Sequence, residues 1–361
     1  MWFYWTFYIG LSFFVMLKMR PVYTFEEPLS RVPRGNFFLF LIILFVGLRH
    51  EVGPDWYSYL RNMEYARGIS LIQFVSLLND PGYGLLNWVG ANFGGGIYFV
   101  NSFSAALLCF GILTYCNFQP RPRLALLVAL PYLIIFVGMG YTRQSVAMGL
   151  VMLALVFLQR EQVIRFILFV ILGALFHKTA LICLLFGILY KFKGLLMLIL
   201  SILISAFLII FLSQTGYIYE VIRIYFGNTA YNSSGATLRV GMTTMPAVIF
   251  LIWRKRFLLA PKQKRFWVII SILTLGFLGL IFIIPNSTTA IDRILLYLIP
   301  LQIMVLSHLP SVFGRLENRN PFWVYSIIGY NGIVLFGYLF YGVNRDSWIP
   351  YQFYPWFLVW S

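Results

Sequence analysis

The chain has 361 residues, of which 61% are hydrophobic and 11% are charged, and its mean hydropathy is +0.84. This composition excludes a soluble globular protein and predicts an all-α polytopic integral membrane protein. The net charge of +16 would favour nucleic acid as the partner of a soluble protein. In a membrane protein basic residues act as topology signals instead, so no nucleic-acid partner is expected.

The first 17 residues are apolar, lack a basic N-terminal region and a small-residue cleavage site, and are followed by Lys18 and Arg20. We interpret them as a retained first span. Several later apolar runs are shorter than the ~20 residues of a straight span. We predict about twelve transmembrane helices, within a range of about 10 to 13, in a single domain over residues 1–361. The apolar runs are about 2–17, 36–48, 97–118, 124–141, 144–158, 163–176, 179–190, 194–212, 241–252, 266–284, 293–308 and 321–341.

The runs 163–176 and 179–190 are separated only by His177 and its neighbours. They could be two short spans or one long interrupted helix. One crossing instead of two would reverse the side of every later loop.

The two longest polar connections are residues 50–96 and 213–240, and we expect both on the outer face. The first contains apolar stretches at 71–78 and 83–89, which predict interfacial or re-entrant helices. Three glycines at 94–96 then provide a flexible joint. The second connection is rich in turn residues and suits hydrogen bonding to a polar substrate.

If the first span runs from outside to inside and the spans alternate, eighteen of the 27 Lys and Arg residues lie on the inner side, as the positive-inside rule requires. The other nine converge on the outer face, where Asp55, His177 and Asp292 also lie. The sequence therefore predicts a cationic site with a few acids and a histidine on that face. The nine outer cations are Arg49, Arg61, Arg67, Arg143, Lys178, Arg223, Arg239, Arg293 and Arg345.

The segment 49–59 places Arg49, Glu51 and Asp55 around a Gly-Pro turn, directly after an apolar run. Ionisable residues near membrane depth are costly and suggest a site for a polar substrate. The alternative is that Arg49 and Asp55 pair with each other at the interface.

Arg143 and Gln144 follow a glycine-containing turn between two spans, and Arg239 opens the span after the second long connection. An arginine offers a fork of donors that suits phosphate oxygens. The alternative is an interfacial arginine that extends its side chain to the headgroups.

Two further pairs interrupt apolar sequence. In His177-Lys178 the neutral histidine can accept a proton and the lysine can bind a phosphate. Asp292 and Arg293 are adjacent on a predicted helix, where side chains point about 100° apart, so they need not pair with each other.

Other chemistries lack their motifs. The three cysteines, Cys109, Cys116 and Cys183, lie in apolar runs without metal spacing and are expected to be core residues. There is no phosphate-binding loop, nucleophile elbow, H-E-x-x-H or D-x-D motif. We expect a metal-independent mechanism without a cofactor.

The order of these motifs resembles the EpsG-type, Wzy-like polysaccharide polymerases of bacterial inner membranes. The similarity extends over about residues 40–300. It is carried by Arg49-x-x-Val52-Gly53-x-Asp55-x-x-x-Tyr59, Pro81-Gly82-Tyr83-Gly84-Leu85-Leu86-Asn87, Arg143-Gln144 with Ala147, His177-Lys178-Thr179-Ala180, and Arg293 with Tyr297.

The resemblance implies a multispan glycosyltransferase of GT-C-like architecture in the cytoplasmic membrane, with its site facing the periplasm or cell exterior. Such an enzyme transfers a growing glycan from undecaprenyl diphosphate onto a new lipid-linked repeat unit, in O-antigen, capsule or exopolysaccharide synthesis. Membrane lipids, a flippase and a chain-length regulator are the implied partners.

For this reaction we expect Asp55 or His177 to act as base and Arg143 to stabilise the leaving group. Arg49 would orient Asp55 or bind phosphate. The remaining candidates for binding the diphosphate or glycan are Tyr59, Gln144, Lys178, Arg239, Asp292 and Arg293.

Two alternatives remain open. An O-antigen ligase uses the same donor, and architecture alone does not separate it from a polymerase. A flippase or transporter would show internal repeats and charges near the midplane. The charges here gather at span ends, which favours chemistry on one face.

Overall fold

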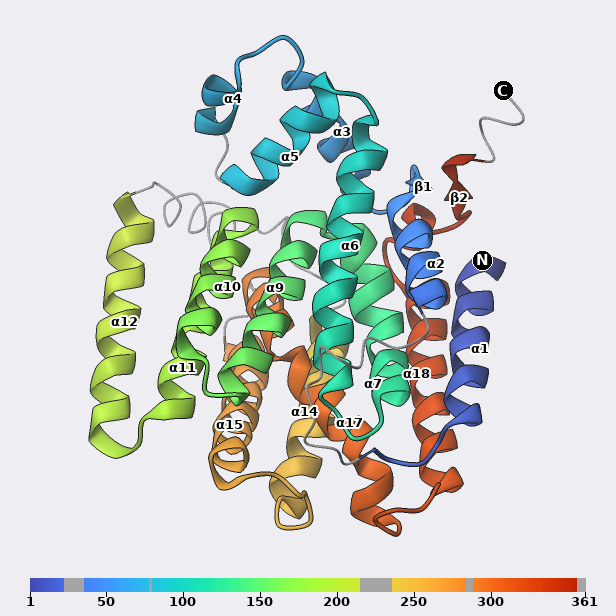
Figure 1. The fold of residues 1–361 in the computed structure, drawn as a ribbon, viewed down its shortest axis with the longest axis vertical. Helices are drawn as coiled ribbons and strands as arrows, with labels where there is room; N and C mark the ends of the chain where they lie inside the picture. The colour runs from blue at the N-terminus through green and yellow to red at the C-terminus, as the bar shows by residue number, and fades with distance from the viewer. Residues whose placement is uncertain (23–35, 78–79, 215–235, 284–287, 356–361) are drawn as a thin grey trace.

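The computed structural model describes residues 1–22, 36–77, 80–214, 236–283 and 288–355. Helices running up and down in one bundle make up most of it (Figure 1). Over the described residues, seven helical segments are long and apolar enough to cross a membrane, and three shorter apolar helices accompany them. The chain is therefore an all-α polytopic membrane protein. The count of about twelve crossings and the GT-C-like architecture stay predictions.

Each predicted apolar run lies in a helical segment, to within about one residue at either end. The helices of the bundle are α1 (Trp2–Leu17), α2 (Asn36–Gly47), α6 (Gly96–Asn117), α7 (Pro122–Ala129), α8 (Gly138–Gly140), α9 (Thr142–Gln159), α10 (Val163–Phe176), α11 (Leu184–Lys191), α12 (Gly194–Gln214), α14 (Ala236–Trp253), α15 (Pro261–Ile283), α16 (Thr288–Leu295), α17 (Ile299–Phe313) and α18 (Pro321–Tyr341). A π-helix, η2 (Leu130–Val137), joins α7 to α8, and the short 3-10 helices are η3 (Lys178–Cys183), η6 (Leu296–Leu298) and η7 (Arg345–Ser347).

The segment 163–190 turns back on itself. Its two ends meet, because the Tyr190 hydroxyl donates at 3.4 Å to the carbonyl of Gln159, which lies just before α10. Helix α10 and the η3–α11 segment therefore form a hairpin, with His177 at its tip. Of the two possibilities left by the sequence, the structure has two short antiparallel segments.

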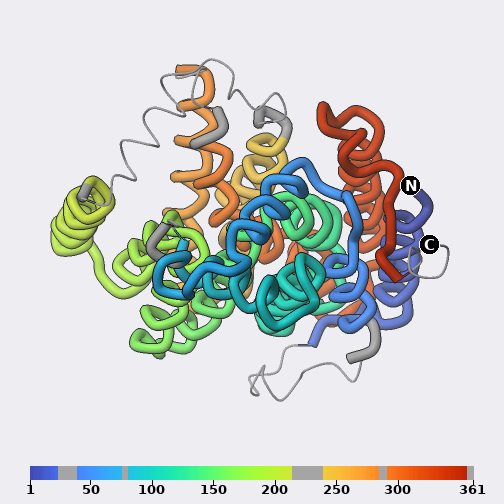
Figure 2. The backbone as a smooth tube through the Cα atoms, turned by 90° about the horizontal axis from the view of Figure 1, so that it is seen from above, coloured from blue at the N-terminus to red at the C-terminus, as the bar shows by residue number. Residues whose placement is uncertain are grey.

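Three short helices cover one end of the bundle: α3 (Trp56–Tyr65), α4 (Leu71–Leu77) and α5 (Pro81–Asn92) (Figures 1 and 2). Helices α4 and α5 confirm the helices predicted at 71–78 and 83–89, whereas α3 was not predicted. Their placement at a membrane interface stays a prediction. The other long connection, 213–240, falls mostly outside the described residues.

A two-stranded antiparallel sheet lies at the same end of the bundle. Strand β1 (Arg49–His50) pairs with β2 (Gln352–Phe353), with Arg49 opposite Phe353. The sheet joins the first candidate motif to the segment after α18 (Figure 1).

Helices α6 and α9 pack with their backbones in direct contact. A Cβ atom added to Gly111 would lie 1.8 Å from the carbonyl oxygen of Gly149, so only glycine fits at this crossing. Small residues allow such close approach of membrane helices. The contact holds α9, whose first residues carry Arg143 and Gln144, firmly in the core.

Helix α12 is the opposite case. It stands at the edge of the bundle in both views, with 6% of its apolar window buried (Figures 1 and 2). The described surface of α12 is therefore available to lipid. The three cysteines are free and buried, as expected from their apolar surroundings.

Candidate active site

Arg49, the first candidate cation, is buried and has a structural role. Its side chain is 1% exposed and donates to the carbonyls of Val46 and Val52 and to the side-chain oxygens of Asn101 and Thr142, at 2.7 to 3.2 Å. These four bonds use most of the five N–H donors of a guanidinium and connect α2 to α6 and α9. The predicted contact with Asp55 or a phosphate is not among them.

Gly53 fixes the turn that follows. Its φ of +107° favours glycine, and an added Cβ would lie 2.6 Å from the Met139 carbonyl oxygen. Its N–H donates to the carbonyl of Ser347 at 2.8 Å. The turn ends at Asp55, the residue that precedes α3. The motif thus presents the Asp55 carboxylate from a rigid backbone.

Asp80 lies at the centre of a first charged group, here called the Asp80 cluster: Asp80, Arg143, His177 and Tyr59. Arg143 donates to the Asp80 carboxylate at 2.8 Å, and its guanidinium also interacts with the Tyr59 hydroxyl. The Nδ1 atom of His177 lies 3.9 Å from the same carboxylate oxygen. The cluster joins the ends of α5, α9 and α10.

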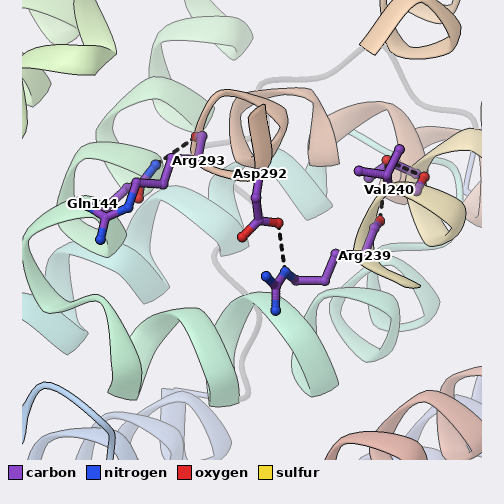
Figure 3. Close-up of polar contacts among 6 residues, drawn as sticks. Gln144, Arg239, Val240, Asp292 and Arg293 are labelled. Carbon is purple, nitrogen blue, oxygen red and sulfur yellow. Dashed lines mark hydrogen bonds and ion pairs between the residues drawn. The ribbon is translucent and has the colours of Figure 1, made fainter. Parts of the chain in front are cut away.

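Arg239 and Asp292 form a second ion pair, at 2.6 Å, between α14 and α16 (Figure 3). Arg293 extends away from this pair, toward Gln144 (Figure 3). Gln144 donates to the Arg293 carbonyl at 2.8 Å, which ties α9 to α16. The adjacent Asp292 and Arg293 side chains thus point in different directions, which the sequence had left open (Figure 3).

Asp55 and Tyr141 connect the two charged groups. The Arg293 guanidinium lies 5.8 Å from the centre of the Tyr141 ring. Arg293 and Arg143 both act electrostatically on Asp55. Residues from six separate stretches of sequence therefore converge on one place at the end of the bundle covered by α3 and α5.

The environment tunes the three titratable groups differently. Burial raises the pKa of the Asp55 carboxyl, and the charges of Arg293 and Arg143 oppose this rise. Burial alone would raise the pKa of Asp80, but His177 and Arg143 outweigh it and hold that pKa below its ordinary value. Burial lowers the pKa of His177 despite the neighbouring Asp80. At neutral pH Asp80 is therefore a carboxylate and His177 a neutral imidazole.

Several buried polar atoms at this site have no hydrogen-bond partner among the described residues: Asp80 Oδ1, His177 Nε2 and Gln144 Oε1. All three side chains are at least nine-tenths buried. Buried polar groups normally have partners, and unpaired ones indicate a bound ligand or water. Hydroxyl groups, which both donate and accept, fit these atoms.

The structure brings most of the predicted site residues together. Lys178 begins η3 directly after His177, at the tip of the α10 hairpin. Arg49 is separate, and Asp80 and Tyr141 were missed. The Asp80-Pro81 pair at the start of α5 was the available signal. The predicted residues that converge are Asp55, Tyr59, Arg143, Gln144, His177, Arg239, Asp292 and Arg293.

Among the described residues, no group of three or more His, Cys, Asp or Glu side chains lies close enough to hold a metal ion. The metal-independent mechanism stays a prediction.

The fold and the site define a polytopic membrane protein with a cluster of arginines and carboxylates at one end of its bundle. The EpsG family model matches residues 35–353, and the chain belongs to the EpsG family. The family is linked to glycosyltransferase-like polysaccharide polymerases. No curated protein and no solved structure matches the chain.

Proposed function

We propose that the protein polymerises oligosaccharide repeat units carried on undecaprenyl diphosphate, at the outer face of the bacterial cytoplasmic membrane. The observation that carries this proposal is the group of two arginines near Asp55, namely Arg143 and Arg293. Arg143 is held on Asp80 at 2.8 Å, and the Arg293 carbonyl accepts from Gln144 at 2.8 Å. A diphosphate leaving group requires cations, and an acceptor hydroxyl requires a base beside them.

In the proposed reaction the acceptor hydroxyl oxygen attacks the anomeric carbon of the growing glycan. The bond from that carbon to the diphosphate oxygen breaks, and its electron pair leaves with undecaprenyl diphosphate. The hydroxyl proton moves to the Asp55 carboxylate. The raised pKa of Asp55 makes it a stronger base than an ordinary aspartate.

His177 is the second candidate for the base. Its imidazole is neutral and lies beside Asp80, but the residue is 5% exposed. Asp55 is more accessible, so we assign it the proton transfer. In this proposal His177 and Asp80 hold Arg143 in position.

The cations have separate roles. Arg143 keeps 39% of its side chain exposed while Asp80 fixes one of its nitrogens, so the rest of its fork can bind phosphate oxygens. Arg293 contributes a second positive charge from α16, and Lys178 contributes a third from the start of η3. Arg239 is neutralised by Asp292 and positions α16.

The predicted topology supports a site facing the periplasm or cell exterior. The lipid-linked unit is assembled on the inner face in this scheme, so a flippase must deliver it. A chain-length regulator is a further expected partner.

The test is a deletion strain of the source bacterium, with and without the plasmid-borne gene, examined for its polysaccharide ladder on a gel. A single repeat unit that becomes a ladder on complementation supports a polymerase. Lipid-linked polymer that accumulates without transfer to the lipid core would indicate a ligase. Unpolymerised units trapped on the inner leaflet would indicate a flippase.

A further inference from the structure

A groove of ≈ 620 Å³ opens at the covered end of the bundle, beside the charged site. Strand β1, helix α3, the first turn of α6 and the segment after β2 surround it (Figure 1). None of its lining residues belongs to the Asp80 cluster or to the Arg239–Asp292 pair. The residues that give it its chemistry are His50, Glu51, Trp56, Arg67, Tyr98 and Tyr354.

Aromatic rings form one side of the groove. Tyr98 and Tyr354 are stacked with their ring centres 3.6 Å apart, and Trp56 lies 6.0 Å from Tyr98. The Nδ1 atom of His50 forms a hydrogen bond with the Tyr98 hydroxyl at 2.5 Å. The stacked pair brings together residues that are far apart in the sequence.

The backbone opens the other side. Gly95 and Gly96 lie on the groove with φ of +78° and +53°, values that favour glycine. Glu51 has a φ of +50°, which is uncommon for a residue with a side chain. The glycines keep side chains out of the groove, and Glu51 and Arg67 remain exposed.

These features match the chemistry of a sugar. The C–H faces of pyranose rings pack against aromatic rings, and their hydroxyls pair with carboxylate, imidazole and guanidinium groups. A diphosphate is a poorer fit, because Glu51 carries a negative charge. Apolar side chains also line the groove, namely Leu48, Leu60, Met63, Ile97 and Phe99. A lipid tail can cover these, but it offers no hydrogen bond to His50, Glu51 and Arg67, whereas a sugar offers both C–H faces and hydroxyls.

Trp56 connects the groove to the charged site. Trp56 is the first residue of α3 and lines the groove. The preceding residue, Asp55, does not line the groove and is under the electrostatic influence of Arg143 and Arg293. A sugar at the Trp56 end would lie next to the candidate base.

We propose that this groove is a glycan-binding subsite that holds the terminal sugars of the acceptor repeat unit beside Asp55. The inference rests on the proposed polymerase function and names the place of one of its two substrates.

The experiment measures binding of the repeat-unit oligosaccharide, released by mild acid from the lipid-linked pool of the source strain, to the full-length protein in detergent. Saturation-transfer NMR reports which sugar protons touch the protein. Tyr98→Ala and Tyr354→Ala should each weaken binding by about two- to tenfold, as expected for loss of one aromatic contact. The exposed Glu51→Gln variant, which removes no packing, should also weaken binding.

Tyr65→Ala is the matched control, because Tyr65 lies on α3, is 70% exposed and does not line the groove. It should bind as the wild type does. Equal binding by all variants, or no saturation transfer to the wild type, would overturn the subsite. Added inorganic diphosphate should not compete; displacement of the oligosaccharide by diphosphate would also count against a glycan site.

The subsite and the polymerase function can fail separately. Loss of glycan binding in Tyr98→Ala, together with a normal polymer ladder in Asp55→Asn and Arg143→Ala, would keep the glycan site and remove the proposed catalytic centre. Loss of the ladder in the latter two variants, with unchanged glycan binding in Tyr98→Ala, would do the reverse.

Discussion

Two ion pairs lie at the same end of the bundle and differ in what their arginines leave exposed. Arg143 and Arg239 each bond a buried carboxylate, at 2.8 and 2.6 Å. The Arg143 side chain is 39% exposed and that of Arg239 is 12% exposed. The pairs therefore have similar geometry and different access to a ligand.

This difference in exposure distinguishes an arginine that can bind a ligand from one that only supports the structure. A buried carboxylate that fixes one nitrogen of an exposed arginine pre-organises the rest of the fork for an anion. A pair enclosed on both sides gives a ligand little access to its donors and mainly joins its two helices. Ion pairing alone therefore does not identify a binding arginine in this protein.

The largest expected effect comes from Asp55, between the two pairs. Asp55→Asn should lower the polymerisation rate by about 10²- to 10⁴-fold, because the acceptor hydroxyl loses its base. The rate is measured as polymer formed by membranes from labelled lipid-linked units, at equal protein levels. Asp346→Asn is the control, because Asp346 is 95% exposed on η7 and should keep wild-type activity. Normal polymer in both Asp55→Asn and His177→Ala would refute the assignment of either as base.

Arg143 should come next. Arg143→Ala should lower the same rate by about 10²- to 10³-fold, because charge on the leaving diphosphate loses a donor. Arg143→Lys keeps a charge for Asp80 but loses the fork, so we expect partial recovery. The double variant Arg143→Ala/Asp80→Ala separates lost binding from an unpaired Asp80. Activity restored in that double variant would mean that Arg143 serves only to neutralise Asp80.

Arg239 should affect stability more than chemistry. Arg239→Ala leaves Asp292 buried without this partner and should lower the free energy of unfolding in detergent by about 3 to 5 kcal/mol. Arg239→Met/Asp292→Leu removes both charges and should recover most of that stability, with a smaller loss of rate than in Arg143→Ala. A stable double variant as inactive as Arg143→Ala would instead make Arg239 a direct ligand of the diphosphate.

The smallest effect is a shift in pH dependence. In the proposed reaction Asp55 accepts a proton and must be ionised, so activity should fall as the pH drops through the pKa of Asp55. Arg293→Gln removes a positive neighbour that lowers this pKa, so the residual activity should fall at a higher pH than in the wild type. Arg345→Gln, at an exposed arginine on η7, should leave the profile unchanged. If the fall in activity at low pH occurs at the same pH or at a lower pH in Arg293→Gln, the charges of Arg293 and Asp55 do not lie close together.

Hydropathy predicted where the helices are but not which are buried. Helix α12 has a mean hydropathy of 3.2 and is 6% buried, whereas α9 has a mean hydropathy of 1.4 and is 89% buried. In a membrane, lipid accepts the most apolar helix, and the core accepts polar residues that find partners. Hydropathy does not rank burial, however, because α18 has the same mean hydropathy as α9 and is 28% buried.

Part of the site could be predicted because charged residues are rare in this sequence and therefore stand out. Asp55, Arg143 and His177 stood out in apolar sequence, and topology placed them on one face. Asp80 was missed because its partner Arg143 is 63 residues away in sequence. Arg49 was expected at the substrate because its sequence context resembles that of a site arginine. Its four internal acceptors come from three helices and a turn, which only the fold assembles.

The strap formed by residues 345–353 has a consequence for how the protein is made. The Ser347 carbonyl accepts a hydrogen bond from the Gly53 N–H, and the Tyr351 hydroxyl donates to the Phe45 carbonyl. Strand β2 pairs with β1. The turn before Asp55 leaves the ribosome early but obtains these partners only after α18 has been translated. A nascent chain can therefore insert most of its helices while this part of the candidate site is still incomplete. Release of an interrupted product would yield a membrane-embedded protein whose candidate site lacks these contacts.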